Sequence, residues 1–169
     1  MAEKNKNLSS ETSYNIPQAS QFKVGMLVSE WNHEVTDALK EGARKTLLDS
    51  GIHEANLVIK RVPGSFELPG AAVMMLEADD KMDAVICLGC VIQGETRHFE
   101  FISQAVANGI MQVGIDYNTP VIFGVLTCDT MEQALDRAGG KHGNKGVEAA
   151  VTCLKMLELE RGPIKNGQI

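Results

Sequence analysis

The sequence predicts an α/β fold in which one parallel sheet lies between two layers of helices. Four apolar segments rich in β-branched residues alternate along the chain with segments that carry the 3.6-residue period of helices. This alternation is typical of right-handed βαβ crossovers, which place successive strands parallel in one sheet. The 169 residues fit one domain with a single core, and no repeat or linker divides them.

The first strand and helix are expected within residues 22–50. The segment FKVGMLVSE (22–30) is mostly apolar and predicts a buried strand. Asn32 then provides an N-cap for a helix that runs to about Ser50. Apolar residues recur on one face of that helix, and Gly51 follows as its stop.

The next two strands differ in how apolar they are. ANLVIKRV (55–62) predicts a strand that a Pro-Gly pair ends, and FELPGAAVMMLEA (66–78) follows as a helix with a proline near its start. DAVICLGCVI (83–92) is nearly all apolar, which is typical of a central strand covered on both faces. Its helix is HFEFISQAVANGIMQVGID (98–116).

The last part of the chain predicts one more strand and two helices. PVIFGVLT (120–127) is the fourth strand, and Thr130 with Gln133 forms a capping box for a short helix. A glycine-rich segment (138–146) leads into the last helix (147–161). Ligands of such sheets bind outside the carboxyl ends of the strands, so the loops after the four strands are the candidate site.

Composition excludes several classes of function. The net charge of −6 and pI of about 5.2 argue against a nucleic-acid-binding protein, which normally shows a basic face. No apolar run is long enough to span a membrane. Residues 1–21 are polar and lack the apolar centre of a signal peptide, so we expect a mobile tail before one domain at 22–169, in a cytoplasmic protein.

Four cysteines are expected to be buried and unreactive. Cys87 and Cys90 have the spacing of a redox C-x-x-C, but they lie inside an apolar strand instead of opening a helix. Without an export signal, disulfides with Cys128 or Cys153 are not expected. No metal site is expected either, because no second pair of ligands has a suitable spacing.

The stretch GETRH (94–98) joins the central strand to its helix. It is not a nucleotide-binding P-loop, because Glu95 stands where that loop needs a lysine, although Thr96 fits the hydroxyl position that follows. Free N–H groups at the helix start suit one small phosphate or carboxylate, and Thr96 could add its hydroxyl. His98, in the first turn, is placed for general acid–base catalysis. The alternatives are an ordinary turn capped by Thr96 and a structural or solvated histidine.

Three further places have both a structural and a functional interpretation. Trp31 either packs against a helix or offers a flat surface on which a planar ring stacks. Glu67 is either an acid favoured by a helix start or a holder of ligand hydroxyls. Residues 137–146 carry three cations and four glycines in an acidic protein, so they either meet an anion or form a flexible connection. We expect His142 in that segment to be solvated rather than catalytic.

Four motifs, VPGSFELPGAA, LGCVIQGETRHFEFI, PVIFGVLT and RAGGKHGNKG, together resemble the lumazine synthase family. The resemblance runs from about Phe22 to the last helix, with the motifs in the family's order. It implies a flavodoxin-like three-layer sandwich, with a four-stranded parallel sheet and helices on both faces. It also implies the penultimate step of riboflavin biosynthesis, a condensation that uses no cofactor. There, 5-amino-6-(D-ribitylamino)uracil and 3,4-dihydroxy-2-butanone 4-phosphate give 6,7-dimethyl-8-ribityllumazine, phosphate and water.

The resemblance also assigns roles to residues. It implies that the uracil and its ribityl chain are held by Trp31, Ser65, Phe66, Glu67, Cys90, Val91, Ile92 and Phe123. It implies that the butanone phosphate is bound by Glu95, Thr96, Arg137 and Lys145, with the carboxylate of Glu95 pointing away. His98 would transfer protons, and Arg137 would clamp the phosphate.

The same resemblance concerns assembly. Phe123 and Arg137 would reach the site from a neighbouring subunit of a homopentamer. The short GGKHGNKG connection looks like that of relatives that form icosahedral 60-subunit shells, and riboflavin synthase would be a metabolic partner. One rival class is a flavin- or lumazine-binding module without catalysis. The other is a shell protein that has lost its activity, and the intact His98 and Arg137 argue against this second class.

Overall fold

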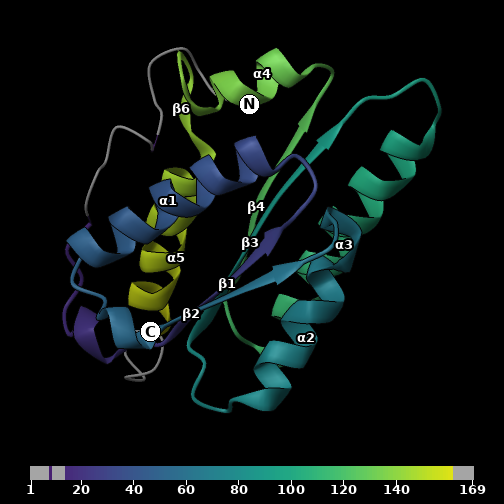
Figure 1. Cartoon of the computed structure of the whole chain (residues 1–169). Coiled ribbons are helices and arrows are strands. Elements are labelled where there is room, and N and C mark those ends of the chain that lie inside the picture. The colour runs from purple at the N-terminus through teal and green to yellow at the C-terminus, as the bar shows by residue number, and fades with distance from the viewer. Residues whose placement is uncertain (1–7, 9–13, 162–169) are drawn as a thin grey trace.

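The computed structural model describes residue 8 and residues 14–161 of the chain. Its main sheet has four parallel strands in the order β2-β1-β3-β4 (Figure 1). The strands are β1 (Val24–Ser29), β2 (Leu57–Val62), β3 (Ala84–Ile92) and β4 (Val121–Cys128). The predicted four-stranded parallel sheet is confirmed.

Helices cover both faces of this sheet, as predicted. The first face carries α1 (His33–Asp49) and α5 (Lys145–Arg161), and the other carries α2 (Leu68–Ala78) and α3 (His98–Tyr117) (Figure 1). Short 3-10 helices are η2 (Ala19–Gln21), η3 (Glu54–Asn56) and η4 (Ser65–Glu67). Among the described residues, none of the helices has the length and apolar character that crossing a membrane requires.

The central strand carries the core on both of its sides. Ile86 and Leu88 of β3 pack with the apolar cluster beneath α1 and α5, and Val85 and Cys87 pack with the cluster beneath α2 and α3. All four side chains are completely buried. This two-sided burial explains why the segment is nearly all apolar, and it confirms the predicted central position.

The first helix begins differently from the prediction. Asn32 precedes α1 in the left-handed conformation (φ 58°), and its side chain makes no capping hydrogen bond. Asn32 therefore takes the predicted N-cap position, but the side-chain capping bond expected of it is not formed. Asparagine tolerates this backbone conformation better than most residues, and its side chain is free to bond elsewhere. The stop is as expected, since Gly51 has a positive φ of 97° just after the helix.

The glycine-rich segment is a hairpin rather than a loose connection. After α4 (Met131–Asp136), β5 (Ala138–Gly140) pairs antiparallel with β6 (Gly143–Asn144), and α5 begins at once with Lys145. The predicted cap of α4 is confirmed, because the Oγ1 of Thr130 accepts a hydrogen bond of 3.2 Å from the Gln133 N–H. In Figure 1, α4 follows the carboxyl end of β4, and the hairpin leads from α4 to the start of α5.

Part of the expected N-terminal tail packs on the domain. Residues 1–7 and 9–13 lie outside the described residues. Ile16 and Ala19 are buried in the core cluster of α1 and α5. The Tyr14 N–H donates to the Oγ of Ser50 (3.0 Å), and the Tyr14 hydroxyl donates to Glu158 (2.6 Å). The packed chain thus begins no later than Tyr14, before the expected boundary at residue 22.

Candidate active site at the carboxyl ends of the strands

Four loops meet where the parallel strands end (Figure 1). Backbone bonds join the first two, because the Glu30 N–H donates to Val62 (2.9 Å) and the Trp31 N–H donates to Pro63 (3.3 Å). A third bond of 2.9 Å joins the ends of β3 and β4, from the Gln93 N–H to the carbonyl of Cys128. The sheet therefore brings segments that are far apart in sequence to one edge, as its topology requires.

Trp31 is an open aromatic surface at this edge. Its side chain is 73% exposed, so it is not a core aromatic. With Glu30, Asn32, His33 and Pro63 it lines a shallow hollow of about 300 Å³. An indole in such a hollow is available for stacking with a planar ring.

The side chain of Glu67 lies beside Trp31. Its Oε2 accepts a hydrogen bond of 2.9 Å from the Gly64 N–H, which closes the turn before α2. A Cβ placed on Gly64 would lie 3.0 Å from this oxygen and 3.4 Å from Cδ1 of Trp31. The carboxylate and the indole thus flank one glycine, and Glu67 serves the turn while it remains exposed to a ligand.

The two residues before Glu67 differ in exposure. Phe66 is 56% exposed, whereas Ser65 is 5% exposed. The Ser65 hydroxyl has no hydrogen-bond partner within the described residues. It lies against β3, because a Cβ on Gly89 would come within 2.5 Å of it. A glycine at that position lets the serine approach the central strand.

Asn32 connects the Trp31 loop to the end of β3. Its Nδ2 donates a hydrogen bond of 3.0 Å to the carbonyl oxygen of Cys90. That carbonyl belongs to the backbone expected to meet the uracil, together with the half-buried Val91 and Ile92. Sequence reasoning missed this contact. The only local signal for it was an asparagine, which tolerates a left-handed backbone, directly after a strand end.

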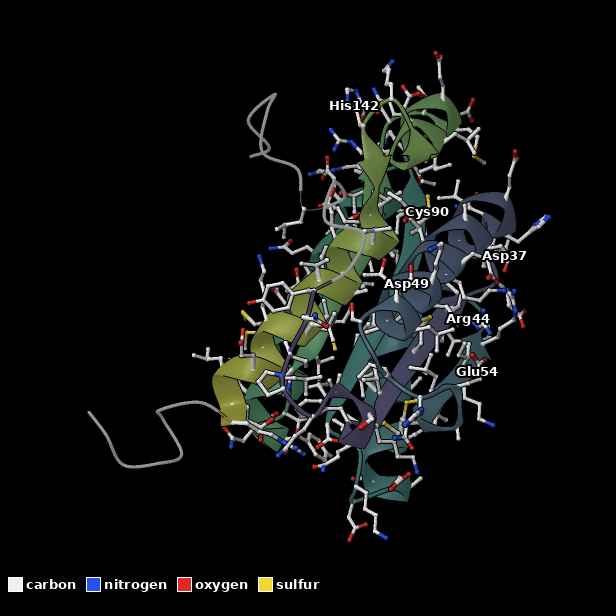
Figure 2. All side chains as sticks on the ribbon, turned by 90° about the vertical axis from the view of Figure 1, so that its left-hand side faces the viewer. Asp37, Arg44, Asp49, Glu54, Cys90 and His142 are labelled. Atoms are coloured by element: carbon white, nitrogen blue, oxygen red, sulfur yellow. The ribbon has the colours of Figure 1, made fainter. Side chains whose placement is uncertain are left out.

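The cysteines are structural, as predicted. Each of the four is buried and free of disulfides. Burial raises the pKa of the Cys87 and Cys153 thiols to about 12, and burial together with the nearby Cys128 does the same for Cys90. Figure 2 shows Cys90 and His142 toward the same end of the molecule. Within the described residues, no group of three or more His, Cys, Asp and Glu side chains could hold a metal.

The GETRH segment presents an open helix start. Residues 94–98 are all exposed. Arg97 takes the N-cap position of α3 without a side-chain capping bond, while the Thr96 hydroxyl accepts a bond of 3.4 Å from the His98 N–H. Thr96 thus has part of the structural role considered as its alternative. The Glu100 N–H donates to the Arg97 carbonyl (3.2 Å), so not every first-turn amide is free. The positive end of this long helix still favours an anion, with His98 on its first turn.

The two predicted phosphate-binding cations flank the hairpin. Arg137 is exposed where α4 ends, and its guanidinium partly offsets the burial that raises the pKa of the Cys128 thiol. Its charge therefore lies near the end of β4. Lys145 begins α5, where its Nζ lies 2.6 Å from the Glu148 carboxylate. The backbones of the two cations are joined by a bond of 2.8 Å from the Lys145 N–H to the Arg137 carbonyl.

Phe123 lies apart from the Trp31 side of the site. It is paired with Cys87 within the sheet, well before the end of β4, and is 41% exposed. Its side chain lines a cavity of about 810 Å³ between α3, β4 and α5, which Lys145 also lines. Trp31, Glu67 and His98 do not line it. The structure therefore places Phe123 and Lys145 in a different hollow from the one that Trp31 lines.

Comparison with known proteins identifies close relatives. The family model described as 6,7-dimethyl-8-ribityllumazine synthase matches residues 21–161. A 6,7-dimethyl-8-ribityllumazine synthase of Cytophaga hutchinsonii is 57% identical over 93% of this chain and 98% of its own length. Proteins of the same name from Porphyromonas gingivalis and Parabacteroides distasonis are 50% and 48% identical, over 92% and 94% of this chain and 96% and 99% of theirs.

Proposed function

This chain belongs to the 6,7-dimethyl-8-ribityllumazine synthase family, and we propose that the strand-end site described above performs the family's condensation. The enzyme joins 5-amino-6-(D-ribitylamino)uracil to 3,4-dihydroxy-2-butanone 4-phosphate, and it releases 6,7-dimethyl-8-ribityllumazine, phosphate and water. It is a transferase of riboflavin biosynthesis. One observation carries the placement of this reaction: an exposed indole and a carboxylate flank Gly64 at the sheet edge where the open start of α3 presents His98.

The uracil substrate occupies the side of the site that Trp31 forms. The indole stacks on the pyrimidine, and backbone groups of Cys90, Val91 and Ile92 read its edge. Asn32 already bonds the Cys90 carbonyl, which leaves the second lone pair of that oxygen for a ligand. Ser65, Phe66 and Glu67 hold the ribityl chain, and the exposure of Glu67 supports this role.

The butanone phosphate occupies the start of α3. The amides of Glu95 and Thr96 bind the phosphate, and the positive end of the helix dipole favours its charge. The Glu95 side chain is exposed, so its carboxylate is free to point toward solvent. Arg137 and Lys145 supply the opposing cations.

The chemistry needs positioning and proton transfer. The 5-amino group attacks the ketone and water is lost as the imine forms. Removal of the proton from the adjacent hydroxyl-bearing carbon then expels phosphate and leaves an enol. The enol tautomerises to a new ketone, and the ring closes when the ribitylamino nitrogen attacks this carbonyl and a second water leaves. His98 transfers protons in these steps, because it lies beside the phosphate position on the first turn of α3.

The site is completed by a neighbouring subunit. Phe123 and Lys145 line a cavity that Trp31 and His98 do not reach within one chain. In a cyclic ring the contacts are head-to-tail, so each subunit gives one half of the site to each neighbour. Phe123, Arg137 and Lys145 thus act in the site of the next subunit.

The assembly is a homopentamer that continues to an icosahedral shell of about 60 subunits, the number the closed symmetry implies. Large apolar side chains of α3, β4 and α5 support subunit contact on this face: Met111, Ile115, Phe123, Met156 and Leu159 are each at least 40% exposed. Light scattering that gives a monomer contradicts both proposals, and a lone pentamer contradicts the shell. We also propose that the protein is cytoplasmic and that riboflavin synthase is its metabolic partner.

The reaction is tested by mixing the protein with both substrates and following lumazine absorbance and fluorescence. Product must appear only when the uracil and the butanone phosphate are both present. Protein without one substrate is the control for intrinsic fluorescence. If the protein binds a substrate but forms no product, it is a binding module and not an enzyme.

A further inference from the structure

The side chain of Asn144 uses all of its hydrogen-bonding capacity where three elements meet. Its Nδ2 donates to the Ala38 carbonyl of α1 (3.0 Å) and to the Ala138 carbonyl of the hairpin (3.2 Å). Its Oδ1 accepts from the Gly146 N–H (2.8 Å) and the Val147 N–H (3.3 Å) in the first turn of α5. An amide offers two donors and two acceptor positions, so no other residue type reproduces this set at the same size.

Two glycines make room for this contact. A Cβ on Gly42 would lie 2.6–2.8 Å from the amide atoms of Asn144, and a Cβ on Gly146 would lie 1.9 Å from the Leu39 carbonyl oxygen. Gly42 is inside α1, where glycine costs about 1 kcal/mol relative to alanine. The fold accepts this cost at the point where the Asn144 amide meets the helix.

The segments that Asn144 bonds lie next to the two cations. Ala138 directly follows Arg137, and Lys145 directly follows Asn144. The Lys145 N–H bonds the Arg137 carbonyl at the base of the hairpin. Neither cation touches Asn144 through its charged group in the hydrogen bonds above, so any influence of Asn144 on them passes through the backbone.

We propose that Asn144 is a positioning residue, which holds Arg137 and Lys145 at the geometry needed to bind the phosphate of the butanone substrate. The inference rests on the proposed role of these cations. In this proposal the Asn144 amide fixes the hairpin against α1. The direction of the Arg137 guanidinium depends on how the hairpin is held. A small displacement of a clamping group has a large effect on the reaction that it serves.

The test compares Asn144→Ala and Asn144→Asp with Asn56→Ala as a matched control. Asn56 also bridges two segments through its Nδ2, to the Ser20 carbonyl at 2.9 Å, but at the amino end of β2. Asn144→Asp keeps oxygen acceptors for α5 and loses both donors. Should Asn144→Ala not fold, this variant still separates the hairpin contact from the cap of α5.

We expect KM for the butanone phosphate to rise about tenfold in both Asn144 variants, an order typical of a misplaced clamping residue, while KM for the uracil stays within about twofold. Asn56→Ala should change only the unfolding temperature. In an Arg137→Ala background, Asn144→Ala should add little further loss of kcat/KM, because both act on the same phosphate contact.

Three results overturn the inference. They are equal changes in both KM values, the same selective change in Asn56→Ala, and losses that multiply independently in the Asn144 and Arg137 double variant. Arg137→Ala by itself distinguishes this failure from that of the proposed clamp. If Arg137→Ala leaves the phosphate KM unchanged, the clamp is wrong and the role of Asn144 falls with it.

Discussion

The side-chain amide of Asn32 donates a hydrogen bond of 3.0 Å to the carbonyl oxygen of Cys90. Asn32 directly follows Trp31, so this one bond fixes the indole loop against the end of the central strand. The stacking surface and the backbone that is proposed to read the uracil edge are thereby held in one geometry.

Substitution of Asn32 should reduce stability in a set order. Asn32→Gly loses the bond to Cys90, worth about 1 kcal/mol, but adopts the left-handed backbone without strain. Asn32→Ala loses the same bond and adds about 1–2 kcal/mol of backbone strain. Denaturant unfolding should therefore rank the wild type above Gly and Gly above Ala. An Ala variant as stable as Gly would show that the left-handed conformation is not retained.

His98→Ala should lower turnover by about 10²-fold, the low end for loss of a general acid–base group, while KM for the uracil changes little. The measurement is steady-state lumazine formation. His53→Ala is the control, because His53 precedes η3 at the opposite end of the strands. Unchanged turnover in His98→Ala removes the histidine from the mechanism.

Arg137→Lys should raise KM for the butanone phosphate roughly 10- to 100-fold, since a hydrogen bond to a charged group contributes about 1.5–3 kcal/mol and lysine cannot pair two N–H groups with one phosphate. Arg44→Lys is the control. Arg44 forms a two-oxygen pair with Glu54, further down α1 from the His142 end (Figure 2). Equal weakening of both substrates would assign Arg137 a structural role.

Mixed rings should recover activity from two inactive variants. Trp31→Ala and Arg137→Ala are unfolded and refolded together in equal amounts. A whole site forms only where an Arg137 variant supplies the tryptophan half and a Trp31 variant supplies the arginine half. The chance is about one quarter of sites for head-to-tail contacts. A mixture no more active than the separately refolded variants would contradict the shared site.

The buried thiols should make the protein less stable in alkali. Burial raises the pKa of Cys87 and Cys153 to about 12 in the folded state, so folding favours the protonated thiols. Their contribution to stability is complete below the ordinary thiol pKa of about 8.5 and is lost as the pH rises toward 12.

The measurement is the free energy of unfolding between pH 8 and pH 11, with Cys153→Ala as a comparison in which the fall should be smaller. Thiol reagents at pH 8 should label the native protein far more slowly than the unfolded one. Rapid labelling of the native state would contradict the burial of these groups.

Much of the molecule was determined by local sequence. The apolar run of β3 predicted a central strand because both of its faces are buried in any doubly covered parallel sheet. Thr130 and Gln133 predicted the start of α4 because capping is a contact between residues three apart. The position of His98 in a first helical turn could also be predicted from local sequence, because Gly94 follows the apolar strand and a helical pattern of residues begins at His98.

Features that depend on contacts between distant segments follow from the tertiary structure and could not be predicted locally. Asn32 reads as a helix cap in sequence, but its amide meets Cys90 because β1 and β3 are neighbours in the sheet. Asn144 lies in what reads as a glycine-rich loop, yet it meets Ala38 across more than 100 residues of chain. Phe123 and Trp31 line different hollows of one chain for the same reason. Sequence periods fix which face of an element is apolar, whereas strand order and packing fix which side chains meet.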